Sequence, residues 1–166
     1  MLDQAGGPPI ADLSHAWLSD AILAPDRRFV ATVGGGRLAL WTLDGERLGR
    51  CWAGPSDRFL AVSPDGTRLV TGSRHPGAVS IVDTAGSTHL ERHVCERKTS
   101  ASSAAFSSDG RRLLVVWSTE AWLLDGRTGE RIASVDGLSD PAQGALSSDG
   151  SVIVVSDGVL RAWRVP

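Results

Sequence analysis

The sequence predicts an all-β protein, a β-propeller of four four-stranded blades. Three observations support this prediction. A short turn motif recurs four times, and its aspartates are separated by 39, 44 and 40 residues. An apolar run follows each copy, and no stretch shows the 3.6-residue periodicity of an amphipathic helix. Four short strands in each unit of about 40–45 residues are typical of propeller blades.

The repeated motif has the chemistry of a tight turn. Its copies begin with Ala-Pro, Ser-Pro, Ser-Ser and Ser-Ser, and their aspartates are Asp26, Asp65, Asp109 and Asp149. An aspartate in such a turn accepts backbone N–H bonds from two residues further on, and a following glycine adopts positive φ at no steric cost. Because each copy lies between apolar runs, it predicts a hairpin.

The elements follow in chain order. Residues 1–9 form a leader rich in glycine and proline, and the propeller domain is expected at 10–166. It divides into a clasp strand at 10–18, blade one at 21–53, blade two at 57–95, blade three at 101–136 and blade four at 142–165. The expected strands are 21–24, 29–33, 38–43 and 47–53; 59–62, 69–72, 79–83 and 88–95; 103–106, 113–117, 121–125 and 131–135; 143–146, 152–156 and 159–164.

Blade four lacks an outer strand in this scheme. An unpaired outer edge would expose backbone N–H and C=O groups, and propellers avoid this by taking the missing strand from the opposite terminus. Residues 10–18 precede blade one and are placed to supply it. The strand would complete either a closed four-blade ring or, on a second chain, half of an eight-blade assembly.

Composition excludes several classes of protein. The 166 residues fit one domain of about 150 residues, and 42% are hydrophobic. A formal net charge of −2 gives no field that would attract nucleic acid or an anionic membrane. The N-terminus does not resemble a secretory signal, and no apolar run approaches the roughly 18 residues of a membrane span. With only two cysteines, a cytoplasmic location is expected.

The third strands carry a family resemblance. Trp41 in Leu-Ala-Leu-Trp-Thr occupies the position of a repeated tryptophan, and Trp163 occupies it in the last blade. Asp83 and Asp125 keep the aspartate that follows it, although no blade has both residues. On these residues the chain, from about Leu13 to Val165, resembles a degenerate WD-repeat β-propeller of bacterial type. The resemblance implies a role in binding other proteins.

The sequence departs from the family pattern at its buried polar network. The family's Gly-His dipeptide before the first strand is missing, and only Ser156-Asp157-Gly158 resembles the turn that would supply the network's aspartate. Since the histidine is absent, we expect this network not to form. Apolar packing and strand ladders are then expected to hold the blades.

We expect no enzyme activity, no cofactor and no metal. No Gly-x-Ser-x-Gly elbow is present, and Gly34-Gly35-Gly36 lacks the lysine of a phosphate loop. His89, Glu91 and His93 share one face of a strand and could ligate a metal, but a solvated outer strand is the simpler interpretation. Cys51 and Cys95 are expected to be free thiols in neighbouring blades.

Two groups of residues are candidates for a protein interface. The first comprises tryptophans outside the repeat position: Trp17 and Trp52, expected on outer strands, and Trp117 and Trp122, which flank a turn. The second comprises two Arg-Arg pairs in turns that look equivalent: Arg27, Arg28, Arg111 and Arg112. The four motif aspartates, Trp41 and Trp163 are interpreted as structural.

These observations favour a non-catalytic interaction or scaffold module that binds a protein partner, with no role for nucleic acid or membrane. Two alternatives stay open. The chain could be a self-assembling half-propeller that dimerises into an eight-bladed ring, because the WD-repeat family usually has seven blades and four are few. It could also be a sensor fragment of a larger multidomain bacterial protein.

Overall fold

The described part of the structure consists of β-strands and the turns between them. The structure is a computed structural model that describes residues 17–51, 58–72, 79–84, 92–95, 100–139 and 143–165. At 49–51 and 92–95 it describes the backbone alone. Fifteen strands form across these residues, with no helix among them. The expected all-β class is confirmed.

The strands form four antiparallel sheets, and each sheet follows the order of the chain. Within the described residues, the first three sheets have four strands and the fourth has three. The strands are β1 (Leu18–Leu23), β2 (Val30–Gly34), β3 (Arg37–Trp41) and β4 (Arg47–Cys51); β5 (Arg58–Val62), β6 (Arg68–Gly72), β7 (Val79–Asp83) and β8 (Arg92–Cys95); β9 (Ala101–Phe106), β10 (Arg112–Trp117), β11 (Glu120–Asp125) and β12 (Arg131–Asp136); β13 (Gln143–Leu146), β14 (Val152–Ser156) and β15 (Leu160–Arg164).

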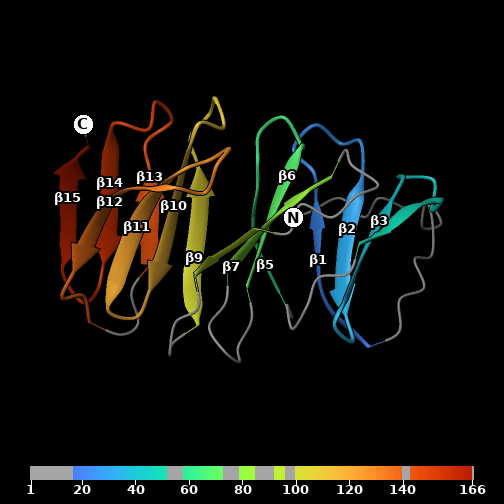
Figure 1. Ribbon diagram of the computed structural model, residues 1–166, viewed down its shortest axis with the longest axis horizontal. Helices are drawn as coiled ribbons and strands as arrows, with labels where there is room; N and C mark the ends of the chain where they lie inside the picture. The colour runs from blue at the N-terminus through green and yellow to red at the C-terminus, as the bar shows by residue number, and fades with distance from the viewer. Residues whose placement is uncertain are drawn as a thin grey trace, which may run out of the picture.

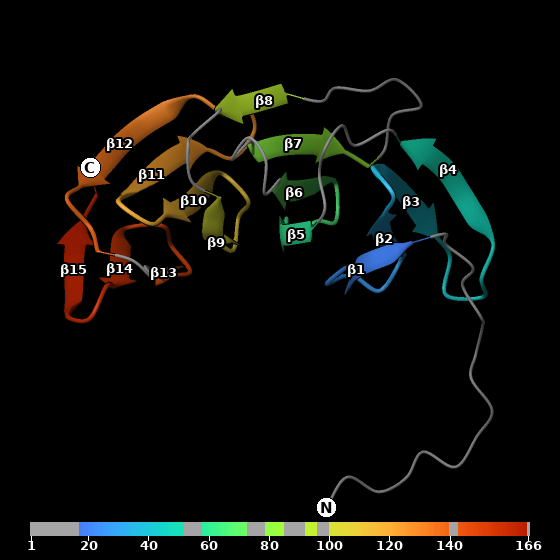
Figure 2. The ribbon, with the colours of Figure 1, turned by 90° about the horizontal axis from the view of Figure 1, so that it is seen from below.

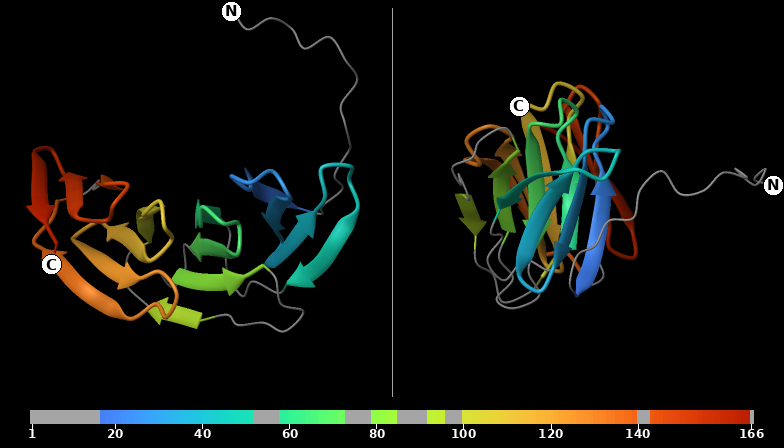
Figure 3. Two further views of the ribbon diagram at one scale, coloured as in Figure 1. Left: turned by 90° about the horizontal axis from the view of Figure 1, so that it is seen from above. Right: turned by 90° about the vertical axis from the view of Figure 1, so that its right-hand side faces the viewer.

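The four sheets stand side by side and form an open arc (Figures 1 and 2). The first strands of the sheets lie on the inner side of the arc, where β1 contacts β5, β5 contacts β9 and β9 contacts β13. The outer side carries β4, β8 and β12 (Figure 2). Sheets one and four lie at opposite ends of the arc (Figure 3). The arrangement is that of propeller blades around an axis, with the circle left open.

Strand register aligns the four repeats. Trp41 pairs with Val30 across β2 and β3, and Trp163 pairs with Ile153 across β14 and β15. In sheets two and three the same position holds Val82, opposite Leu69, and Leu124, opposite Leu113. The position that resembles the repeated tryptophan therefore has the same backbone environment in every sheet.

The core consists of three layers, one between each pair of adjacent sheets. In β10, Leu113, Val115 and Trp117 belong to the layer shared with sheet two, whereas Leu114 and Val116 belong to the layer shared with sheet four. A strand with two buried faces is apolar at successive positions, which explains the continuous apolar runs of the sequence. Burial of each such side chain contributes roughly 1.5–3 kcal/mol to folding.

The beginning of the described chain differs from expectation. Leu18, expected to end the clasp strand, is the first residue of β1 and pairs with Gly34. The first strand of sheet one therefore covers Leu18–Leu23 instead of 21–24. Trp17 immediately precedes this innermost strand, so its expected place on an outer strand is wrong. Residues 10–16 of the expected clasp lie outside the described residues.

Candidate interaction surface

The four motif turns lie along one face of the arc, which we call the turn face. It is defined by residues 24–29, 63–68, 107–112 and 147–152, which join the first and second strands of the sheets. The turns after β3 and β11 lie at the same end of their sheets as the motif turns. The last residue of each of these strands, Trp41 or Asp125, pairs with the first residue of the preceding strand, Val30 or Arg112. Short loops held by a rigid sheet are a common location for binding residues.

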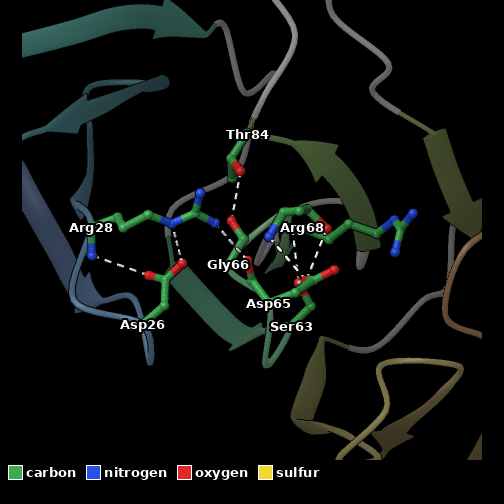
Figure 4. Close-up of polar contacts among 8 residues, drawn as sticks. Asp26, Arg28, Ser63, Asp65, Gly66, Arg68 and Thr84 are labelled. Carbon is green, nitrogen blue, oxygen red and sulfur yellow. Dashed lines mark hydrogen bonds and ion pairs between the residues drawn. The ribbon is translucent and has the colours of Figure 1, made fainter.

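The second motif turn shows the hydrogen-bond pattern (Figure 4). Ser63 Oγ donates to Asp65 Oδ1 at 2.6 Å and accepts the backbone N–H of Arg68 at 2.9 Å. Asp65 Oδ1 also accepts the backbone N–H of Thr67 at 3.1 Å. The same pattern recurs in the turns that contain Ser107 with Asp109 and Ser147 with Asp149. Serine and aspartate thus act together to fix the turn.

These bonds favour the ionised aspartates. The Ser63 hydroxyl, with help from neighbouring donors, lowers the pKa of Asp65 to about 2. The Ser147 hydroxyl and the backbone after it lower the pKa of Asp149 to about 2. The pKa of Asp109 is also lowered, chiefly by the serine of its own turn. The turn face therefore keeps its carboxylates charged well below neutral pH.

The first motif turn departs from the other three. Ala24 replaces the serine, and its N–H bonds the carbonyl of Phe29, as Ser63 N–H bonds the carbonyl of Arg68. This equivalence places Arg27 at the glycine position. Arg27 has a φ of 60°, close to the 67° of Gly66 in the second turn. A residue with a Cβ is strained in this left-handed conformation.

The two Arg-Arg pairs lie in turns with the same backbone hydrogen bonds, but at positions that differ by one residue. Because Arg27 corresponds to glycine, Arg28 corresponds to Arg111, and the pairs are offset by one residue. Arg112 instead corresponds to Phe29, since their carbonyls accept the equivalent turn bonds. The two arginines that follow one another in each of these turns therefore occupy different positions in the first and the third turn.

Arg28 joins the first turn to the second (Figure 4). Its Nη2 donates to the carbonyl of Asp65 at 2.8 Å, and its Nε forms an ion pair with Asp26. The Asp26 carboxylate in turn lies against Gly66, where a Cβ would be only 2.6 Å from Oδ2. Glycine is therefore favoured at this position for two reasons. It adopts a positive φ without strain, and it leaves room for the neighbouring turn to approach closely.

Arg112 makes the corresponding link between the third and fourth turns. Its Nη1 donates to the carbonyl of Gly150 at 3.0 Å, and its aliphatic stem packs against the same glycine. Ser108 adds two bonds, since both its N–H and its hydroxyl donate to the carbonyl of Ser148. Arg28 and Arg112 therefore bind neighbouring turns, a structural role that the interface expectation did not include.

A groove separates the second and third turns. It has a volume of about 420 Å³ and combines three carboxylates with three guanidinium groups. Arg111 reaches into solvent with an 81% exposed side chain, 3.8 Å from Asp109. Guanidinium groups bind carboxylates and carbonyls, while carboxylates bind cationic side chains. The groove is lined by Asp65, Thr67, Arg68, Asp83, Asp109, Gly110, Arg111 and Arg127.

Two of the candidate tryptophans lie in the core. Trp117 is fully buried and Trp122 is 9% exposed, with ring centroids 5.3 Å apart. Trp122 Nε1 donates to Glu120, and the Arg131 guanidinium lies 4.8 Å above the Trp122 ring. The expectation that they contact a partner is corrected, because both pack in the layer between sheets two and three.

The other tryptophans have different environments. Trp17 is 84% exposed, and Trp52 lies outside the described residues. Trp41 is buried, and its Nε1 donates to Thr32 Oγ1 at 2.7 Å. Trp163 packs against the core layer between sheets three and four. Trp41 thus packs on its own sheet, whereas Trp163 contributes to a layer between two sheets.

A polar contact on the opposite face was missed from the sequence. The Asp157 side chain is 1% exposed and accepts the Ser139 N–H at 3.0 Å and Arg161 Nη1 at 2.7 Å. Burial opposes ionisation of Asp157, but these bonds outweigh it and lower its pKa. With the Trp41–Thr32 bond, this contact corrects the expectation that only apolar packing and strand ladders hold the blades.

The described residues contain no cluster of His, Cys, Asp and Glu that could hold a metal. His89 and Glu91, weighed as ligands, lie outside them, as does the side chain of His93. No helix in this part of the chain has the length and apolarity needed to cross a membrane.

Comparison of this chain with known proteins identifies its fold but no family to which it belongs. No family model matches the chain, and no curated protein matches it in sequence. Many solved structures do match. U3-55K has a TM-score of 0.69 at 16% identity, over 92% of this chain and 50% of that one.

Other solved structures give the same result. The β-propeller domain of Cps50 (Swd1) from Myceliophteria thermophila has a TM-score of 0.68 at 18% identity, over 90% of this chain and 52% of that one. Hydrazine synthase from Kuenenia stuttgartiensis has a TM-score of 0.66 at 19% identity, over 91% and 44%. The WD40 repeats of RRP9 also match, with a TM-score of 0.69 at 16% identity over 92% of this chain and 50% of that one. The chain therefore has a WD-repeat-like propeller fold and spans about half the length of these neighbours.

Proposed function

We propose that this chain is a non-catalytic interaction or scaffold module that binds another protein at its turn face. The groove between the second and third motif turns is the observation that carries this proposal. Its three carboxylates and three guanidinium groups lie on turns and at the adjoining strand ends. The likeness to WD40-type propellers supports a scaffold role in general.

The groove favours a polar partner segment. Three aspartates and three arginines give it nearly balanced charge, so a segment with both acidic and basic residues fits better than a polyanion. Arg111 is well placed to bind a partner, because its side chain is 81% exposed. Arg28 and Arg112 are engaged with neighbouring turns. Trp17, which is 84% exposed, is a second contact candidate away from the groove.

The remaining expectations belong to the same proposal. We place the protein in the bacterial cytoplasm, acting without cofactor and apart from nucleic acid and membranes. The net charge of −2 supports the exclusion of nucleic acid. Hydrazine synthase among the structural neighbours shows that this fold also occurs within an enzyme, so we rest the absence of catalysis on the sequence.

Charge reversal in the groove tests the proposal. Chemical crosslinking in the native host, followed by mass spectrometry, would identify a partner of the wild-type chain. Arg111→Glu should reduce its recovery at least tenfold. Arg37→Glu is the matched control, because Arg37 is exposed at the start of β3, away from the motif turns. Equal recovery with both variants would contradict binding at the groove.

A second candidate function is self-assembly of a half-propeller. The open arc favours it over a closed four-blade ring, and the fourth sheet has three strands in the described residues. The clasp strand proposed at 10–18 would complete that sheet, with Leu18 now assigned to β1. A sensor fragment of a larger multidomain protein is the other alternative, supported by the half-length match to the neighbours.

A further inference from the structure

Both ends of the arc carry sheet faces that have no neighbouring sheet (Figure 3). Side chains alternate between the two faces of a strand. In sheet one, Ala31 and Val33 pack toward sheet two, so Val30 points to the open side, as does its cross-strand partner Leu23. We call this the leading face. It is defined by Leu23 and Val30, which lie beside the buried Trp41.

The equivalent face of every other sheet is covered by the sheet before it. Leu23 pairs with Val30, and by the same register its equivalents are Val62, Phe106 and Leu146. Each of these three packs against the core layer shared with the preceding sheet. Leu23 alone among the four is more than half exposed, at 52%. The leading face therefore has the chemistry of a sheet interface without its partner.

Sheet four carries the complementary surface, which we call the trailing face. It is defined by Val154, Leu160 and Ala162, which point away from Ile153, Val155 and the third sheet. Counting back from the repeated tryptophan position, Leu160 and Ala162 correspond to these buried pairs in the first three sheets: Leu38 and Leu40, Val79 and Ile81, Ala121 and Leu123.

The exposures of the two sets differ sharply. The six equivalent side chains are at most 5% exposed and pack toward the following sheet, whereas Leu160 is 72% exposed. Ala162 is also exposed. A leucine left in water at a position that is buried in three other repeats indicates a surface that is covered in the working assembly.

We propose that a second copy of this chain covers both faces, with the trailing face of each copy packed on the leading face of the other. This inference rests on the self-assembly function proposed above and names the surfaces that carry it. One chain presents both halves of the repeated interface, so two chains related by a two-fold axis leave neither half open. Two copies also match the length of one complete neighbour, since each spans about half of it.

The mass in solution tests the pairing. Light scattering of the wild-type chain should give about 35 kDa, twice the 17.5 kDa of one chain. Leu160→Arg places an unpaired charge in the proposed interface and should weaken dimerisation on the order of 100-fold. Ile132→Arg is the matched control, since Ile132 is 44% exposed on the outer strand β12, away from both faces. Circular dichroism should show the same strand content in both variants.

A mixing experiment tests the head-to-tail arrangement. Leu23→Arg should also give monomers. An equimolar mixture of the Leu23→Arg and Leu160→Arg chains restores one intact junction, so its average mass should exceed that of either variant alone. An unchanged mass on mixing would overturn the arrangement.

Other outcomes have defined meanings. A wild-type mass of 17.5 kDa would overturn self-assembly, and a mass that grows without limit would show open head-to-tail chains instead of a ring. A Leu160→Arg chain that stays dimeric would overturn the assigned surfaces while leaving self-assembly intact. Arg111→Glu should leave the mass at about 35 kDa, so failure of partner binding at the turn face remains distinguishable.

Discussion

Substitution of Gly66 by alanine probes the contact between the first and second motif turns. Gly66 has a φ of 67°, and a Cβ there would be 2.6 Å from Asp26 Oδ2. The left-handed conformation costs about 1–2 kcal/mol for a residue with a Cβ, of which reduced unfolded-state entropy returns roughly 0.4–1 kcal/mol. Displacing the neighbouring carboxylate adds roughly 1 kcal/mol. Gly66→Ala should therefore lower the free energy of unfolding by about 2 kcal/mol.

Gly137→Ala is the matched control. Gly137 has a φ of 75°, but a Cβ added there would meet no atom of the described residues within 4 Å beyond its own chain neighbours. Only the backbone strain remains, and the expected cost is about 0.5–1 kcal/mol. Urea unfolding at a fixed protein concentration would measure both variants. The fixed concentration matters because assembly would make stability concentration-dependent.

A double-mutant cycle isolates the contact itself. In an Asp26→Ala background the carboxylate is gone, so Gly66→Ala should cost no more than Gly137→Ala. Equal costs for the two glycine variants in the wild-type background would refute the proposed approach of the first turn to the second. So would a Gly66→Ala cost that is unchanged when Asp26 is replaced.

Three further predictions concern the turn bonds and the core. Ser63→Ala removes the hydroxyl that bridges Asp65 and the Arg68 N–H. It should lower the free energy of unfolding in urea by about 1 kcal/mol and raise the pKa of Asp65 in an NMR titration. Asp65 and Asp149 have folded pKa values of about 2 against a usual 3.8, so their ionised forms stabilise the fold fully above pH 4 and this effect is lost as pH falls toward 2. Tm should therefore drop between pH 4 and pH 2, and a constant Tm would contradict the stabilising role of these carboxylates. Trp117→Ala should cost about 3–5 kcal/mol, and Trp117→Phe should cost less, because the buried indole N–H has no hydrogen-bond partner among the described residues. Equal thermal stability of the two variants would argue against packing of this ring.

Local signals in the sequence were sufficient to predict the repeat. The motif turns bond within six residues, as the Ser63–Arg68 bonds show, so their spacing and chemistry are visible in the chain. The expected all-β class and WD-repeat-like fold follow from these turns and from the apolar runs. Trp41 and Trp163 could be aligned because each lies near the end of a third strand, at one register position opposite the second strand.

Contacts between turns were not predictable in the same way. The bond from Arg28 to the Asp65 carbonyl spans 37 residues and depends on how closely two sheets approach. The place of Arg27 is different, because the repeated motif itself aligns Arg27 with the glycine of the other three copies, and its φ of 60° agrees with that position.

The tryptophans and Asp157 were misjudged for a related reason. Trp117 is on the same face of β10 as Leu113 and Val115, and this alternation indicated burial more strongly than the nearby turn indicated exposure. Asp157 finds Ser139 and Arg161 in place of the family's histidine. A missing residue type does not exclude a network, because backbone N–H groups and arginine donate equally well.

A crystal structure of the full chain would distinguish a two-chain ring from a closed monomer, because it shows how many sheets surround one axis. We expect two chains in one ring of eight sheets, with Leu160 of each copy buried against Leu23 of the other. A single chain whose fourth sheet packs on its own first sheet, as a closed ring of four, would contradict it.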